Sequence, residues 1–200
     1  MVNFELQTFY IYKGVGRMIN HVGTKTLETK RLILRRFELS DAEDMFNNFA
    51  NNENVSRFLS WYPHENVETT KKLLISWIEE YKNDNRYMWA IVLKENHQVI
   101  GSISVVGMSE KHQTAELGYS IGEAYWGKGI ATEAVEAVIA FLFNEVGFHR
   151  IQAKHDTRNP ASGRVMEKVG MKFEGTMRHE RIHKDGSRGD TSIWAIIHDE

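Results

Sequence analysis

The chain has 200 residues, of which 42% are hydrophobic and 26% are charged, and its formal net charge is -2. This composition is typical of one globular domain and excludes disordered and fibrous classes, while the scattered basic residues argue against nucleic acid as a direct partner. No apolar run is long enough to span a membrane, and the absence of cysteine excludes disulfides and a thiolate nucleophile and is compatible with a cytoplasmic location.

Residues 1–26 are predicted to be an N-terminal appendage to a domain that covers residues 27–200. Residues 9–12 have the aromatic and β-branched side chains of a short strand, but Lys13 and Arg17 do not form the pattern of a secretion signal. Met18 is an alternative natural start, and the sequence leaves that choice open.

Hydrophobic periodicity predicts alternating strands and helices along the domain. In chain order, the expected elements are a strand at residues 31–37, helices at 40–49 and 67–81, strands at 87–93, 99–106 and 114–121, a helix at 131–146, a strand at 150–155, a helix at 161–169, and strands at 172–178 and 191–197. This order predicts an α/β (α+β) fold in which helices cover the faces of a mixed sheet.

The first of these helices has a predicted starting point. Ser40 and Glu43 have the spacing of a capping box, in which the serine oxygen accepts from a free N–H and the glutamate reaches back. The helix is therefore expected to begin at Ser40 and to continue through Phe49.

The most informative segment follows the strand at residues 114–121. Gly127 and Gly129 lie in a loop that leads directly into a helix. Without a Cβ, such a loop can turn tightly and direct successive N–H groups at one point, where the helix adds the positive end of its dipole. The spacing matches neither the dinucleotide-binding nor the Walker pattern, so a different phosphate-bearing cofactor is predicted.

Several motifs in the same chain order resemble the GNAT acyltransferase superfamily, most closely its branch of ribosomal-protein N-terminal acetyltransferases. They are Glu116 on a central strand, the loop at residues 126–131, and the sequence Asn-Pro-Ala-Ser at residues 159–162. The resemblance covers residues 27–199. It implies a mostly antiparallel twisted sheet of about seven strands with helices on both faces, split between the fourth and fifth strands, and acetyl-CoA as cosubstrate without a metal.

The resemblance also implies which residues hold the diphosphate of coenzyme A. The superfamily's loop reads Gln/Arg-x-x-Gly-x-Gly/Ala, and Gly129 and Ala131 match its last two fixed positions, whereas Trp126 departs from the first. Because backbone N–H groups do most of the binding, this departure is expected to weaken the contact without abolishing the site. The implied contact residues are Trp126, Gly127, Lys128, Gly129, Ile130, Ala131 and Thr132.

In this superfamily the strand before the loop separates from its neighbour and pairs with the pantetheine arm instead. Leu117, Tyr119 and Ile121 are the residues that the resemblance places along that contact, although strand side chains of this kind also serve as plain sheet core. Asn159 is implied to hold the same arm.

Glu116 falls where related acetyltransferases keep a glutamate that acts as general base. An amine is mainly protonated below its pKa of about 8 to 10, and only the free amine attacks a thioester, so a carboxylate that accepts the proton has a clear purpose. A structural alternative is a carboxylate paired with a nearby lysine or arginine. Glu180 is a second candidate for the base.

Ser162 is implied to protonate or stabilise the departing CoA thiolate. Many relatives place a tyrosine four residues later for this purpose, but Met166 stands there and cannot donate a proton. A helix-capping role for Ser162 is the alternative. His155, His179 and His183 invite a base hypothesis, but lone strand histidines are more often packed than catalytic.

The predicted function is direct transfer of an acetyl group to a primary amine, such as the α-amino group of a ribosomal protein. A small-molecule amine, for example a polyamine, amino sugar or amino acid, is the nearest alternative. A non-catalytic CoA-binding module is the alternative from another class, and a homodimer is left open.

Overall fold

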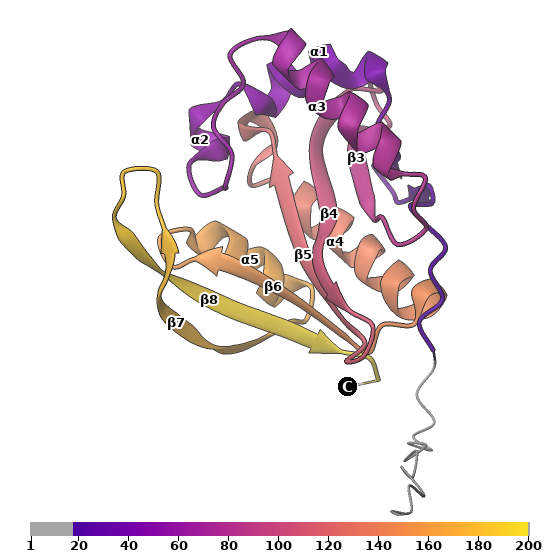
Figure 1. Ribbon diagram of the computed structural model, residues 1–200, viewed down its shortest axis with the longest axis vertical. Coiled ribbons are helices and arrows are strands. Elements are labelled where there is room, and N and C mark those ends of the chain that lie inside the picture. The colour runs from indigo at the N-terminus through magenta and orange to yellow at the C-terminus, as the bar shows by residue number, and fades with distance from the viewer. Residues whose placement is uncertain (1–17, 200) are drawn as a thin grey trace, which may run out of the picture.

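The computed structural model describes residues 18–199, so the short strand expected at residues 9–12 lies outside the described part. An eight-stranded sheet of order β1-β2-β3-β4-β5-β6-β8-β7 forms the centre of the molecule (Figure 1). Its strands are β1 (Leu27–Glu28), β2 (Leu32–Arg35), β3 (Met88–Leu93), β4 (Val99–Ser109), β5 (Thr114–Ile121), β6 (Arg150–Asp156), β7 (Lys172–Ile182) and β8 (Arg188–Ile197).

Five α-helices and four shorter helical turns connect these strands. The α-helices are α1 (Ala42–Met45), α2 (Glu53–Ser56), α3 (Val67–Glu80), α4 (Ile130–Phe141) and α5 (Pro160–Lys168). The turns are η1 (Leu39–Asp41), η2 (Phe46–Ala50), η3 (Glu123–Tyr125) and η4 (Leu142–Val146), of which η2 and η4 are π-helical. The predicted α/β class and the mostly antiparallel sheet are confirmed. The strand beyond the predicted seven is β1, whose two residues are too few to show a period.

β5 and β6 are the parallel pair of the described sheet, and they separate part-way along their length. Their rungs join residues 114–117 to residues 150–153 and stop at Leu117 and Ala153, although both strands continue. β5 stays paired with β4 as far as Ile121, and β6 stays paired with β8 as far as Asp156. β5 with β4 forms one arm of the sheet and β6 with β8 forms the other. The two arms separate beyond Leu117 and Ala153, which confirms the predicted split (Figure 1).

Hydrophobic side chains form a separate cluster on each face of the sheet. On one face, α1, η2 and α3 pack on β3 through residues such as Leu74 and Ala90, and this cluster includes no residue of β5 to β8. On the other face, α4 packs on β3 to β6 around residues such as Trp89 and Ile151. Full burial of one such side chain contributes roughly 1.5–3 kcal/mol. No residue of β5 to β8 belongs to the first cluster, and the segment after α2 reaches β7 through a hydrogen bond from Arg181 to Phe58 O.

The predicted capping box at Ser40 and Glu43 is wrong. Glu38 is the N-cap of η1, and its backbone N–H donates to Asp41 Oδ2 at 2.8 Å. Asp41 is buried and also accepts two hydrogen bonds of 2.8 Å from the guanidinium of Arg35 on β2. Because this bidentate pair fixes Asp41 at the third helical position, the box forms two residues earlier than the sequence spacing indicated.

This correction gives a stability prediction. Asp41→Ala should lower the free energy of unfolding by about 2–3 kcal/mol, because it leaves the half-buried Arg35 unpaired and removes the cap. Ser40→Ala is the matched control, and it should change that free energy by less than about 0.5 kcal/mol. Urea unfolding followed by circular dichroism measures both, and equal losses would contradict the assignment.

Candidate active site

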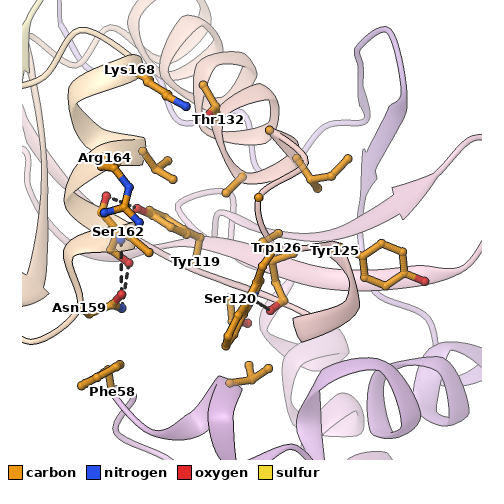
Figure 2. A pocket seen from close by; sticks show the side chains of 18 of the residues that line it. Phe58, Tyr119, Ser120, Tyr125, Trp126, Thr132, Asn159, Ser162, Arg164 and Lys168 are labelled. Atoms are coloured by element: carbon orange, nitrogen blue, oxygen red, sulfur yellow. Dashed lines mark hydrogen bonds between the residues drawn. The ribbon is translucent and has the colours of Figure 1, made fainter.

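A cavity of about 310 Å³ lies at the split, beside the end of β5 (Figure 2). The N-terminal turn of α4 and one side of α5 form two of its walls, residues of α2 with Phe58 and Leu59 also line it, and Phe58 lies at the end opposite Thr132 and Lys168 (Figure 2). It therefore joins the glycine loop to the region where the two arms of the sheet part.

The glycine loop has the backbone conformation of an anion site. Gly127 and Gly129 have φ angles of 72° and 74°, in the left-handed region that favours glycine, and Gly129 is the N-cap of α4. In the described chain, the main-chain N–H of Trp126 donates to Glu123 O, and the N–H of Glu133 donates to Gly129 O, which is the first bond of α4. The N–H groups in between are available to a phosphate at the helix N-terminus.

Residues between β1 and β2 form hydrogen bonds with this loop and with the first turn of α4. Arg31 donates to Lys128 O at 2.8 Å and to Glu133 Oε2 at 2.7 Å, and Thr29 donates to Glu133 Oε1 at 2.6 Å. Burial acts to raise the pKa of Glu133, but the hydrogen bonds from Thr29 and Arg31 outweigh it, so the pKa is lowered. These hydrogen bonds were not predicted from the sequence, because the residues that they join are about a hundred positions apart.

Two cations on α5 also face the cavity and were missed from the sequence. Arg164 and Lys168 lie one helical turn apart and line the wall opposite the glycine loop (Figure 2). Neither forms an ion pair with another residue in the described part of the chain. Their charges can therefore meet phosphate oxygens that the loop leaves uncovered. Their spacing on a short amphipathic helix was the available signal.

The three β5 residues predicted along the pantetheine differ in their surroundings. Tyr119 and Ile121 lie beyond the last rung with β6 and line the cavity, whereas the Leu117 side chain is buried in the core at that rung. Trp126 donates its indole N–H to Ile121 O at 2.7 Å. The residue that departs from the superfamily loop thus satisfies a carbonyl at the end of the separated strand.

Asn159 and Ser162 lie together at the start of α5. Asn159 Oδ1 accepts from the backbone N–H of Ser162 at 3.4 Å, and Asn159 Nδ2 donates to Ser162 Oγ at 3.1 Å. The Tyr119 hydroxyl donates to the main-chain carbonyl of Ser162 at 3.1 Å. Met166 is buried in the core and does not line the cavity. Ser162 is the hydroxyl that this helix presents to the split (Figure 2).

Glu116 does not line the cavity, and its side chain is partly exposed. Its Oε2 accepts from Gln152 Nε2 at 2.7 Å and lies 3.2 Å from Lys154 Nζ. Lys154 is also 3.8 Å from Glu180 Oε1, and Glu180 accepts a hydrogen bond from Thr191. The alternative of a carboxylate paired with a lysine is therefore observed, and both candidate bases belong to one ion cluster.

The side chains of His155 and His183 have structural partners, and the main-chain N–H of His179 donates to Asp190. His155 accepts from the indole of Trp194 at Nε2 and bonds Asp156 O through Nδ1, which engages both ring nitrogens. His183 lies 3.2 Å from the buried carboxylate of Asp156. Among residues 18–199, no group of three or more histidines and carboxylates is arranged to hold a metal ion.

Comparison with known proteins decides the family. The acetyltransferase (GNAT) domain matches residues 31–172. The chain belongs to the GNAT acetyltransferase family. It is 33% identical to the uncharacterized N-acetyltransferase YoaA of Bacillus subtilis over 171 residues, which are 86% of this chain and 96% of that protein. The GNAT domain is thereby identified as an N-acetyltransferase that uses acetyl-CoA as acyl donor.

Two further relatives are named for ribosomal proteins. The ribosomal protein uS5-alanine N-acetyltransferase of Escherichia coli is 27% identical to this GNAT domain over 177 residues, 85% of this chain and 89% of that protein. The structure of the ribosomal-protein-S5-alanine acetyltransferase from Vibrio fischeri is 26% identical, with a TM-score of 0.77 over 88% of this chain and 98% of that one. No helix among residues 18–199 has the length and apolarity needed to cross a membrane.

The cavity gives a pH prediction. Burial raises the pKa of Tyr119 to about 12, against the opposing effect of the Ser162 side chain. The unfolded chain, with a tyrosine pKa of about 10, loses its proton first, so this contribution to stability is complete below pH 10 and is lost as the pH rises towards 12. Relative to Tyr119→Phe, the wild type should lose about 1 kcal/mol of unfolding free energy between pH 9 and pH 11. Urea unfolding at both pH values measures this, and a constant difference would contradict it.

Proposed function

We propose that this GNAT domain acetylates the α-amino group of a protein, such as a ribosomal protein, in the cytoplasm. The observation that carries the proposal is the part of β5 to β8 outside the first hydrophobic cluster, here called the open face, where the side chains of Glu116 and Glu180 are 25% and 37% exposed. A chain terminus can reach such a surface. The similarity to two ribosomal-protein alanine acetyltransferases supports the same acceptor class.

The donor half of the site is proposed to bind coenzyme A in three parts. The N–H groups of residues 127–132 hold the diphosphate, with Arg164 and Lys168 facing it. The free edge of β5 at Tyr119 and Ile121 pairs with the pantetheine amides, and Asn159 contacts the same arm. Both reactants are then held at the split, and positioning of this kind supplies a large part of the rate of a two-substrate reaction.

The acceptor half is proposed to work through the ion cluster on the open face. Glu116 accepts a proton from the amine, directly or through water, and the free amine attacks the thioester carbonyl. A C–N bond forms, the C–S bond breaks, and the electron pair left on sulfur is stabilised by the hydroxyl of Ser162. Without cysteine, no acyl-cysteine intermediate takes part.

Donor binding is tested at Gly129. Gly129→Ala should weaken coenzyme A binding by at least about tenfold, because a Cβ at this positive φ distorts the loop that aims its N–H groups. Gly186→Ala is the matched control, since Gly186 has a φ of 80° but lies in the β7–β8 turn. Isothermal titration calorimetry measures both affinities. Equal affinities would contradict the assignment of the loop.

Catalysis is tested on the two carboxylates. Glu116→Gln should lower kcat by about 10²–10⁴ without changing acetyl-CoA affinity, because general base catalysis typically contributes that factor. Glu180→Gln should have a smaller effect if Glu116 is the base, and the reverse order would assign the role to Glu180. Glu174→Gln is the control, since Glu174 is an ion-pair partner of Arg150 on β6.

The acceptor class is tested by release of free CoA with a panel of acceptors. Peptides that carry the N-termini of ribosomal proteins should be turned over faster than polyamines, amino sugars or amino acids. A preference for the small amines would favour the small-molecule alternative. Tight acetyl-CoA binding without turnover on any acceptor would favour the non-catalytic module.

A further inference from the structure

Tyr119 connects the two arms of the split. It belongs to β5, beyond the last rung with β6, whereas Ser162 belongs to α5, which packs on β6. The hydrogen bond of 3.1 Å from the Tyr119 hydroxyl to the main-chain carbonyl of Ser162 therefore crosses a gap that no strand pairing spans. It ties the first turn of α5 to the separated end of β5.

The same turn fixes the direction of the Ser162 hydroxyl. Asn159 Oδ1 accepts from the backbone N–H of Ser162, which orients the amide so that Nδ2 donates to Ser162 Oγ. A serine hydroxyl has one hydrogen and two lone pairs, so accepting from Asn159 leaves its own hydrogen for another group. Ser162 lines the cavity, so this hydrogen can be directed into it.

Three contacts thus hold Ser162 at its N–H, its carbonyl and its hydroxyl oxygen, and its hydroxyl hydrogen can turn towards the cavity. We propose that Tyr119 is a positioning residue, which fixes Ser162 in the split so that this hydrogen is donated to the sulfur of coenzyme A. The inference rests on the proposed function, because it concerns the same donor site. Tyr119 acts through Ser162 and does not itself contact the sulfur.

The tyrosine is suited to this task over the whole range of an assay. Burial raises the pKa of Tyr119 to about 12, so the phenol keeps its proton and remains a donor at pH 9. A thiolate is the form of the sulfur that a hydroxyl hydrogen stabilises most, and raising the pH to 9 increases the share of thiolate. Binding at pH 9 therefore isolates the contact between Ser162 and sulfur.

The test compares coenzyme A with desulfo-coenzyme A, which lacks the sulfur, by isothermal titration calorimetry at pH 9. The wild type should bind coenzyme A about tenfold more tightly than the desulfo compound, since a hydrogen bond to a charged group has that value. Ser162→Ala should abolish this preference, and Tyr119→Phe should reduce it several-fold. In the Ser162→Ala background, Tyr119→Phe should have no further effect on the preference.

Tyr62→Phe is the matched control, because it removes an exposed phenol hydroxyl and should retain the wild-type preference. Wild-type protein that binds both compounds equally would overturn the inference, as would an unchanged preference in Tyr119→Phe. An effect of Tyr119→Phe that persists without Ser162 would also overturn it, because the tyrosine would then contact the sulfur itself. Failure of the wild type to bind either compound would instead reject the donor site of the proposed function.

Turnover gives a second measurement. Tyr119→Phe should lower kcat severalfold and leave the KM of the amine acceptor unchanged, because the contact with sulfur strengthens as the thiolate departs. A rise in acceptor KM with unchanged kcat would overturn the inference.

Discussion

The site depends on the loss of hydrogen bonding between β5 and β6 after Leu117 and Ala153. In a parallel pair each missing rung leaves N–H and C=O groups without partners, and such groups are costly unless another group or solvent satisfies them. The indole of Trp126 donates a hydrogen bond to the carbonyl of Ile121, and the hydroxyl of Tyr119 donates one to the carbonyl of Ser162 on α5. The remaining edge is free for a ligand that carries amide groups, as pantetheine does. The split is therefore held open by side chains that belong to the site itself.

The glycine loop and the first turn of α4 are linked through residues between β1 and β2. Arg31, next to β2, bonds both the Lys128 carbonyl and Glu133 in the first turn of α4. A carboxylate there is favourable in the field of the helix N-terminus, and its bonds to Thr29 and Arg31 keep it turned away from the ligand side. The positive end of α4 is consequently left to an external anion. Short β1 and β2 thus contribute to the fold and to the donor site together.

Local patterns were sufficient to predict the parts of the site that depend on backbone shape. The loop with Gly127 and Gly129 is specified by residues close in sequence, whereas the separation of β5 from β6 was implied by the family resemblance. Parts that depend on tertiary pairing were not predicted. Arg35 moved the cap from Ser40 to the pair of Glu38 and Asp41, and Lys154 reaches Glu116 from the next strand of the sheet. No spacing rule relates Arg31 to Glu133, because their contact exists only once α4 packs near β1.

The pairing of Glu116 with Lys154 is compatible with its proposed role as base. The cluster contains two carboxylates, Glu116 and Glu180, and one ammonium, so its summed formal charge is negative, and it lies on an open face where an incoming ammonium is attracted. Lys154 and Gln152 hold Glu116 in place and separate it from the second carboxylate. On the proposed function, the acceptor enters as a cation and leaves as a neutral amide. The negative charge of the cluster attracts the substrate but not the neutral product. This difference favours release of the product after transfer.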